Sequence, residues 1–336
     1  MGLQIGEIVP KTEISLESLK GKIIAVDAFN TIYQFLTTIR QPDGTPLMDS
    51  KQRVTSHLSG LFYRTLSLLN MGIKPVYVFD GKAPELKQKT HEARAKIKEE
   101  AFAGFETAET IEEKAKFASR ISFLTGEMIE ESKELLSAMG VPVIQAPSEG
   151  EAQASYMAKV GDAYACASQD YDSLLFGAPK LIQNVTLSRK RRLASGLFVS
   201  INPQVIELEK VLEVLEINHE QLICLSILVG TDYNPKGVHG IGPKTALKIV
   251  KEHKSPALIF KEVAKTKEID FNWQEIFELF KKPDVIKKYS LKFKPIDEKK
   301  ILKLLCDEHE FSEERIKSAL AKLGEQKEKQ KQKTLF

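Results

Sequence analysis

The sequence has few cysteines and no long hydrophobic run. Its three cysteines, Cys166, Cys224 and Cys306, are odd in number and widely spaced, which argues against a disulfide framework or a zinc site. Each lies in an apolar stretch, so we expect small core residues in a reducing compartment. No run is long enough to span a membrane, and the N-terminal segment lacks the apolar core of a signal peptide. We therefore expect no association with a membrane.

The sequence also has little net charge. Its 49 basic and 46 acidic residues give a formal charge of only +3, so the total says little about partners. A hydrophobic content of 42% and a charged content of 28% are typical of a soluble globular protein with one large or two smaller domains. If acidic residues gather in one pocket, the remaining surface is more basic than the total implies. That distribution suits a polyanionic substrate.

What the sequence does contain is a set of carboxylates at the ends of apolar segments. Asp27 ends Ile-Ile-Ala-Val, and Asp80 ends Val-Tyr-Val-Phe. The full set comprises Asp27, Asp80, Glu149, Glu151, Asp170, Asp172 and Asp232. Converging like charges repel one another unless cations neutralise them. Oxygen ligands without matching His or Cys favour Mg²⁺ or Mn²⁺, so the pattern predicts two-metal hydrolysis of a phosphoester.

Strand-like apolar runs alternate with helical patterns, which predicts a mostly parallel α/β sheet flanked by helices. The predicted strands are 23–27, 75–79, 141–144, 164–167 and 180–183, and the predicted helices are 30–39, 53–70, 132–139 and 149–159. Ligands of such sheets bind at the carboxyl ends of strands. After Asn218 the pattern is helical, and the Lys/Gln/Glu-rich tail from Gly324 is predicted to be disordered.

Three short motifs leave alternatives open. Ser148 to Glu151 matches a capping box, so Glu151 could cap a helix or hold a metal ion. Asp170 and Asp172, two residues apart, could form a turn or face one cation. The basic run 189–192 could contact a phosphate backbone, act as a localisation signal or simply be solvated.

Two longer segments also have both a structural and a functional interpretation. The charged segment 82–126 contains no strand-like run, and it could be a solvated helical hairpin or a basic arch that grips a nucleic-acid strand. The run from Gly237 to Ala246 places three glycines before Pro243, which suits the first turn of a helix. Its exposed amides would hold a phosphate, as in a helix-hairpin-helix element, although a plain helix connector has a similar composition.

Together these motifs resemble the structure-specific 5′ nucleases, and most closely the flap endonucleases of the archaeal type. The resemblance extends from Met1 to about Leu323. It rests on Val26-Asp27-Ala28, Val78-Phe79-Asp80-Gly81, Glu149-Gly150-Glu151-Ala152-Gln153-Ala154, Ser168-Gln169-Asp170-Tyr171-Asp172 and Gly230-Thr231-Asp232-Tyr233, in family order and spacing.

The resemblance implies a PIN-like core and a role for each candidate residue. One metal group would use Asp27, Asp80, Glu149 and Glu151, and a second would use Asp170, Asp172 and Asp232. The arch cations would be Lys87 and Arg94, and the base-stacking tyrosine would be Tyr33. Gly2 would approach the active site after removal of the initiator Met. The helix-hairpin-helix, with Gly237, Gly240, Gly242 and Lys244, would hold K⁺ and duplex phosphates.

The resemblance also implies an organisation and a set of partners. The predicted regions are 1–100 and 127–232 for the nuclease core, 82–126 for the arch, 219–323 for the helical DNA-binding region and 324–336 for a flexible tail. A sliding-clamp motif is incomplete: Gln332 and Leu335 match, but the chain stops at Phe336. We expect a monomer located in the cytoplasm at the nucleoid, or in the nucleus in a eukaryote.

The expected activity is cleavage of 5′ flaps, with 5′–3′ exonuclease activity at nicks and gaps, in DNA replication and repair. It would depend on two Mg²⁺ ions per site, for which Mn²⁺ would substitute. A PIN-like ribonuclease and a non-enzymatic DNA-binding scaffold are the alternatives. A phosphatase of the haloacid dehalogenase type is disfavoured, because that chemistry needs Asp-x-Asp and Phe29 breaks the pattern.

Overall fold

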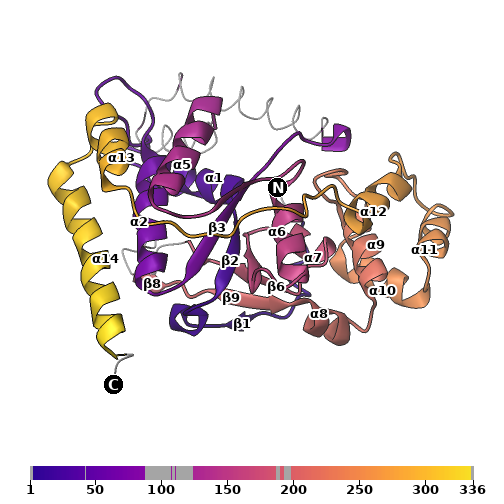
Figure 1. The fold of residues 1–336 in the computed structure, drawn as a ribbon. Coiled ribbons are helices and arrows are strands. Elements are labelled where there is room, and N and C mark those ends of the chain that lie inside the picture. Colours follow the sequence, from indigo (N-terminus) through magenta and orange to yellow (C-terminus); the bar gives the residue numbers. More distant parts are fainter. Residues whose placement is uncertain are drawn as a thin grey trace.

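The fold was obtained as a computed structural model that describes residues 3–41, 43–87, 107, 110, 124–186, 190–192 and 198–333. Most of the predicted arch therefore lies outside the described residues, as do Gly2, Arg94, Leu335 and Phe336. The chain places its sheet in the centre and its C-terminal helix at the end opposite to helices α9–α12 (Figure 1). No helix among the described residues is long and apolar enough to cross a membrane.

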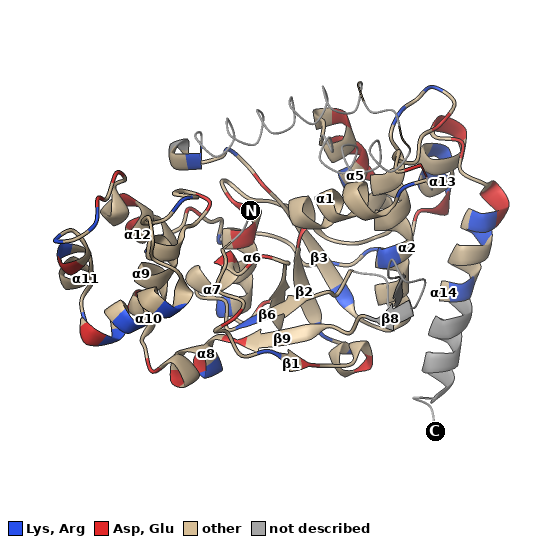
Figure 2. Ribbon diagram, turned by 180° about the vertical axis from the view of Figure 1, so that it is seen from behind, with Lys and Arg blue, Asp and Glu red and all other residues tan. Residues whose placement is uncertain are grey.

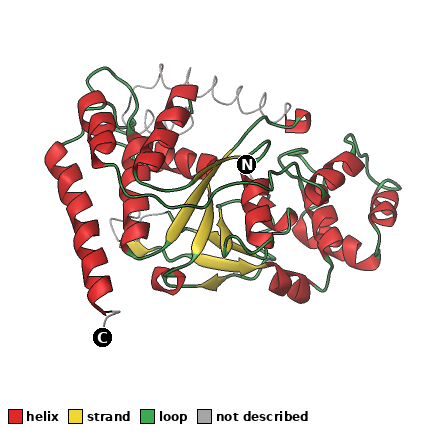
Figure 3. Ribbon diagram, viewed as in Figure 1, coloured by secondary structure: helices red, strands yellow, loops and turns green. Residues whose placement is uncertain are grey.

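The central sheet has seven strands within the described residues, in the order β1-β9-β6-β5-β2-β3-β4 (Figure 3). Its parallel strands are β2 (Ile23–Asp27), β3 (Lys74–Phe79), β4 (Val143–Gln145), β5 (Ala165–Ala167) and β6 (Lys180–Gln183). The strand β9 (Gln204–Glu207), which pairs with β6, and the edge strand β1 (Thr12–Glu13), which pairs with β9, are antiparallel and were not predicted. The mostly parallel sheet is thus confirmed.

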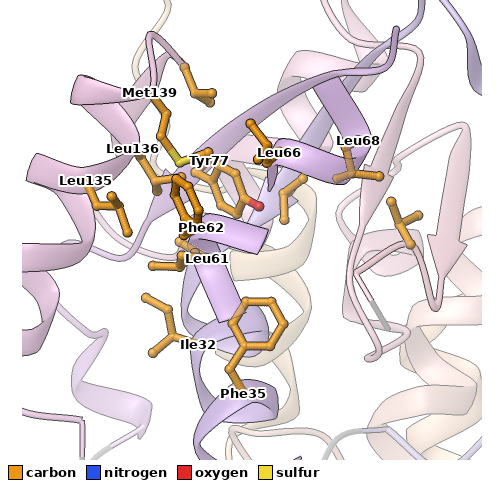
Figure 4. Close-up of a cluster of buried hydrophobic side chains, with 14 of the residues drawn as sticks. Ile32, Phe35, Leu61, Phe62, Leu66, Leu68, Tyr77, Leu135, Leu136 and Met139 are labelled. Atoms are coloured by element: carbon orange, nitrogen blue, oxygen red, sulfur yellow. The ribbon is translucent and has the colours of Figure 1, made fainter. Parts of the chain in front are cut away.

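The two faces of the sheet bury alternate residues of the same strands. Ile24 and Val26 of β2 join a core with α1 (Ala28–Thr38), α2 (Ser56–Asn70) and α5 (Gly126–Ala138) (Figure 4). Ala25, between them, packs on the other face with α6 (Gly150–Lys159). This period-2 pattern covers both faces with helices, as parallel sheets require.

The helices that follow the sheet form a separate core, which α7 (Asp172–Leu175), between β5 and β6, joins. These helices are α8 (Leu208–Leu215), α9 (His219–Val229), α10 (Pro243–Glu252), α11 (Pro256–Val263) and α12 (Trp273–Lys281). Leu3 and Ile5 near the N-terminus are buried in the same cluster.

A short hairpin, β7 (Lys190–Arg192) with β8 (Phe198–Ser200), carries part of the basic run. The DNA role of that run stays a prediction.

The C-terminal part departs from the predicted continuous helical pattern. Residues 283–297, hereafter the strap, are extended and run back across the core (Figure 1). The strap is fixed by Gln153, whose amide exchanges hydrogen bonds of 2.8 and 3.0 Å with the backbone of Ile286. It leads to α13 (Glu298–Leu302), a π-helical turn (Lys303–Glu308) and α14 (Glu313–Lys333). The predicted disordered tail from Gly324 is helical as far as Lys333.

Two predicted helix boundaries were wrong for local reasons. Helix α2 begins at Ser56 rather than Arg53, because the backbone amide of Arg53 donates to the Asp49 side chain in the preceding turn. Helix α5 begins at Gly126 rather than Ser132, because the Thr125 side chain accepts from the amide of Met128 and caps an earlier first turn.

Candidate metal centre and active site

The sheet topology brings carboxylates from distant parts of the sequence to one edge. Strand β2 pairs in parallel with β3 on one side and with β5 on the other, so the chain order reverses at β2. Asp27 ends β2, Asp80 follows β3, and Asp170 lies in the loop after β5. A reversal of this kind is the place where open α/β sheets bind ligands. The predicted position of these three side chains is therefore the observed one.

Backbone amides at helix starts orient Asp27 and Asp80. Asp27 caps α1 by accepting from the amide of Asn30 at 3.0 Å. Asp80 accepts from the amide of Gly150, the first residue of α6, at 2.6 Å. A Cβ at position 150 would lie 2.7 Å from the same Asp80 oxygen, so glycine permits this approach. Asp27 and Asp80 thus accept hydrogen bonds from helix starts and also form part of the candidate site.

The predicted capping box at Ser148 is wrong. Glu149, rather than Ser148, is the cap residue of α6, and it makes no side-chain capping bond. Glu151 accepts instead from the amide of Ser173 in α7, at 3.0 Å. The bond turns the Glu151 carboxylate toward the Asp170–Asp172 loop and away from its own helix end.

One lysine lies among the carboxylates. The ammonium of Lys87, in a 3₁₀ turn (Glu85–Lys87), forms an ion pair with Glu149 and lies 3.6 Å from an oxygen of Asp232. The Tyr233 hydroxyl donates to the other Glu149 oxygen, and Lys87 lies 5.6 Å from the centroid of the Tyr233 ring. Lys87 thus supplies positive charge to residues that were predicted to belong to both metal groups.

The seven carboxylates lie close enough to influence one another's pKa values. Burial, reinforced by Asp80 and Asp170, raises the pKa of Asp27 to about 8. Burial and neighbouring acids also raise the pKa of Asp80, and they raise those of Glu151 and Asp172 well above the usual range. Burial alone would lower the pKa of Lys87, but Glu149 and Asp232 outweigh it and raise that pKa. Such mutual shifts arise when like charges converge with too little counter-charge.

The donor set fits hard divalent cations. All seven side chains offer carboxylate oxygens, the ligands that Mg²⁺ and Mn²⁺ prefer. Among the described residues, no group donates a hydrogen bond to the buried Oδ1 of Asp172. No three His, Cys, Asp or Glu side chains in the described ranges are already close enough to enclose one ion. A metal ion here would require the carboxylates to move closer together, and Glu149 would have to exchange its ion pair with Lys87 for the ion.

The predicted DNA-contacting residues lie on two other surfaces. Tyr33 on α1 is 36% exposed, so it is not a core residue. Helices α9 and α10 are joined by a compact turn in which Gly237 and Gly240 have φ of +55° and +78°. A Cβ at Gly237 would lie 2.4 Å from the backbone of Val229, so only glycine fits there.

The start of α10 presents backbone amides at the surface. Gly242 is its cap residue, Pro243 is the first helical residue, and no side chain caps this end. Exposed Lys244 and Lys248 follow, and Lys251 is a third basic residue of α10 (Figure 2). An uncapped helix start followed by lysines can hold an anion, and phosphate and K⁺ binding there stay predictions.

Sequence reasoning missed two residues that hold the carboxylates. Asn30 bonds the side chain of Asp170, and Tyr233 bonds Glu149. Tyr233 adjoins Asp232 in the quoted motif, so its position was a usable signal. Asn30 stands three residues after Asp27, but nothing in a single sequence links it to a loop 140 residues away.

Comparisons with known proteins agree along the whole chain. The XPG N-terminal domain matches residues 4–101, and the XPG I-region matches residues 140–232. The chain is 54% identical to "Flap endonuclease 1" of Pyrococcus abyssi, covering 100% of this chain and 97% of that protein. It is 55% identical to the protein of that name from Pyrococcus horikoshii, covering 96% and 94%.

Solved structures give the same picture. Flap endonuclease-1 from Methanococcus jannaschii is 45% identical, with a TM-score of 0.78 and coverage of 97% of this chain and 98% of that chain. The catalytic core of Rad2, solved in complex with DNA substrate, is 25% identical, with a TM-score of 0.70 and coverage of 95% and 97%. All seven carboxylates lie within the two matched XPG regions.

Proposed function

Because the chain belongs to the flap endonucleases of the XPG family, we propose that it is a structure-specific nuclease that cuts 5′ flaps in DNA replication and repair. The observation that carries this proposal is the gathering of seven carboxylates, with Lys87, at the carboxyl ends of β2, β3 and β5. A cluster with so much uncompensated charge is costly to fold and is explained by cations and a phosphodiester substrate.

Each group of residues then has a chemical role. Asp27, Asp80, Glu149 and Glu151 would hold one Mg²⁺ ion, and Asp170, Asp172 and Asp232 would hold the other, with Mn²⁺ as a substitute. The bound ions would supply Lewis-acid activation of water and neutralise charge on the leaving oxygen. The Lys87 ammonium, released from Glu149, would contact the scissile phosphate, with Arg94 as the second cation.

Recognition would depend on the shape of the DNA rather than on its bases. The turn between α9 and α10 offers backbone amides and the exposed Lys244 to duplex phosphates, with K⁺ in the turn, and neither group reads sequence. Tyr33 would stack on a base beside the site. We further propose 5′–3′ exonuclease activity at nicks, a monomeric state, and clamp binding through Gln332, Leu335 and Phe336.

The test is a substrate panel of 5′-flap, single-stranded and blunt duplex DNA, with an RNA strand of the flap sequence. With Mg²⁺ the flap is expected to be cut fastest, and EDTA is expected to abolish cleavage. An Asp80→Asn variant should lose at least about 100-fold in rate. The exposed Asp284→Asn serves as the matched control and should match the wild type. Equal cutting of all substrates would reject structure specificity, and undiminished cutting by Asp80→Asn would identify a contaminating nuclease.

A further inference from the structure

Asn30 connects the two halves of the candidate metal centre. It lies in the first turn of α1, where its backbone amide donates to Asp27 at 3.0 Å. Its side-chain Nδ2 donates to Oδ2 of Asp170 at 2.9 Å. Its Oδ1 accepts from the backbone amide of Gln169 at 3.2 Å. A single residue thus bonds the carboxylate at the end of β2 and grips the loop after β5.

The side chain, rather than the position alone, makes the connection. Any residue at position 30 except proline would donate its backbone amide to Asp27. Only a primary amide offers a donor and an acceptor on one planar group at this reach. A leucine of similar size would lose both bonds, and alanine would lose them together with the volume.

The two hydrogen bonds of the Asn30 side chain fix the orientation of the Asp170 carboxylate. The bond from Nδ2 selects one carboxylate oxygen, and the bond to Gln169 holds the backbone that carries the side chain. Groups that orient a ligand in this way set the affinity of a metal site even though they do not touch the metal. The Ser168 hydroxyl accepts from the amide of Asp170 at 3.2 Å and stiffens the same loop.

We propose that Asn30 is a positioning residue that orients Asp170 and sets the spacing between the two carboxylate groups. The proposal rests on the proposed function, because it takes these carboxylates to be divalent-metal ligands. Asn30 acts through Asp170, so its replacement should weaken metal binding without weakening the binding of duplex DNA through α10.

The experiment measures Mn²⁺ binding to the full chain without DNA, by electron paramagnetic resonance. Asn30→Leu is expected to weaken Mn²⁺ binding by about 10- to 100-fold, the range typical of ligand-orienting residues. Gln34→Leu is the matched control. Gln34 lies one turn further along α1, and its side-chain oxygen accepts from the Thr186 hydroxyl at 3.0 Å. It ties α1 to a loop in the same manner, so its loss should leave Mn²⁺ binding within about twofold of the wild type.

A double-mutant cycle separates positioning from a general structural role. If Asn30 acts through Asp170, Asn30→Leu should weaken Mn²⁺ binding no further in an Asp170→Asn background. Undiminished Mn²⁺ binding by Asn30→Leu, or an equal further loss in the Asp170→Asn background, would overturn the proposal. Asn30→Ala replaces Asn30→Leu if the leucine variant unfolds at a lower denaturant concentration than Gln34→Leu.

The wild type distinguishes this proposal from the proposed function. If the wild type binds no Mn²⁺ and cuts no flap, the metal-dependent function itself fails. If it does both and Asn30→Leu behaves identically, only the role of Asn30 fails. A rise in the Mg²⁺ concentration for half-maximal cleavage, with an unchanged KM for flap DNA, would support the role as well.

Discussion

Two largely buried clusters of charged side chains among the described residues differ in how their charges are balanced. The candidate metal centre gathers seven carboxylates around Lys87. The second cluster, hereafter the histidine cluster, comprises Asp49, Arg53, His57, Glu131 and His309. It lies where α2, α5 and the turn before α14 meet. Here each acid faces a basic side chain, whereas in the metal centre acids mainly face other acids.

The histidine cluster is connected from end to end. Glu131 accepts from Nε2 of His309 at 2.9 Å and contacts Nε2 of His57 at 3.3 Å. The other ring nitrogen of His309 lies 3.3 Å from Asp49, which also pairs with Arg53 at 2.8 Å. The chain of contacts ties the C-terminal segment to the preceding core helices.

The pKa shifts of the two clusters have opposite signs. Burial would raise the pKa of Glu131, but the hydrogen bond from His57 and the charge of the histidines outweigh it and lower the pKa. Burial would likewise raise the pKa of Asp49, which Arg53 and His309 lower. In the metal centre burial and like charge raise the pKa values of Asp27 and Asp172. A balanced buried cluster supports the fold, whereas an unbalanced one holds charge for a ligand.

The largest effect is expected from breaking the balanced cluster. Glu131→Ala leaves two buried histidines without their shared acceptor, and it should lower the free energy of unfolding by about 3 kcal/mol. Urea unfolding at neutral pH in EDTA measures the loss. The control is Glu130→Ala, one residue earlier on α5, where an exposed carboxylate pairs with Lys133. That change should cost less than about 1 kcal/mol. Equal losses in the two variants would mean that the histidine cluster contributes nothing special to stability.

The second prediction concerns the metal centre, where removing a charge should stabilise the protein. Asp172→Asn removes one buried charge from the metal centre, and in EDTA it should raise the free energy of unfolding by about 1–2 kcal/mol. The same change should reduce Mg²⁺-dependent cleavage by at least about 100-fold. Urea unfolding and flap cleavage measure the two effects, with Asp284→Asn as the neutral control. A destabilised Asp172→Asn protein would show that repulsion at the site is smaller than its pKa shifts imply.

Much of the fold could be predicted because hydrophobic pattern dominates it. β6 has the predicted boundaries, and α1 differs by one or two residues at each end. The strand β9 was missed because its pairing with β6 depends on long-range contacts that a local pattern does not contain. The strap was missed for the same reason, since it is held by long-range bonds to Gln153 and to the loop before β4.

The candidate site could be predicted where its residues follow apolar strands or belong to recognisable motifs. Asp27 and Asp80 follow apolar runs, so their meeting at one sheet edge could be inferred. The bonds that orient them could not, because Asn30 and Tyr233 act across 140 and 84 positions of sequence. The histidine cluster was missed entirely, since five unremarkable residues gain significance only when the C-terminal turn closes on α2 and α5.

The smallest effect is the dependence of stability on pH. The pKa of Glu131 is below its usual value of 4.5 in the folded protein. Its contribution is therefore fully present above that value and is lost as pH falls through the folded pKa. Between pH of about 6 and 3, Glu131→Gln should lose less stability than the wild type, by under about 1 kcal/mol, because the Glu131 carboxylate keeps some contact with water, which screens its charge.

Asp27 should make stability change with pH in the opposite direction, and the same pH series measures this. Its pKa is raised to about 8, so in EDTA its contribution is present below the usual value of 3.8 and is lost as pH rises through about 8. An Asp27→Asn variant should therefore flatten the fall in stability between pH of about 4 and 8, and Glu131→Gln the fall below pH of about 5. Urea titrations of both variants at each pH measure the two slopes. Parallel curves for wild type and Glu131→Gln below pH of about 5 would remove the electrostatic distinction between the clusters.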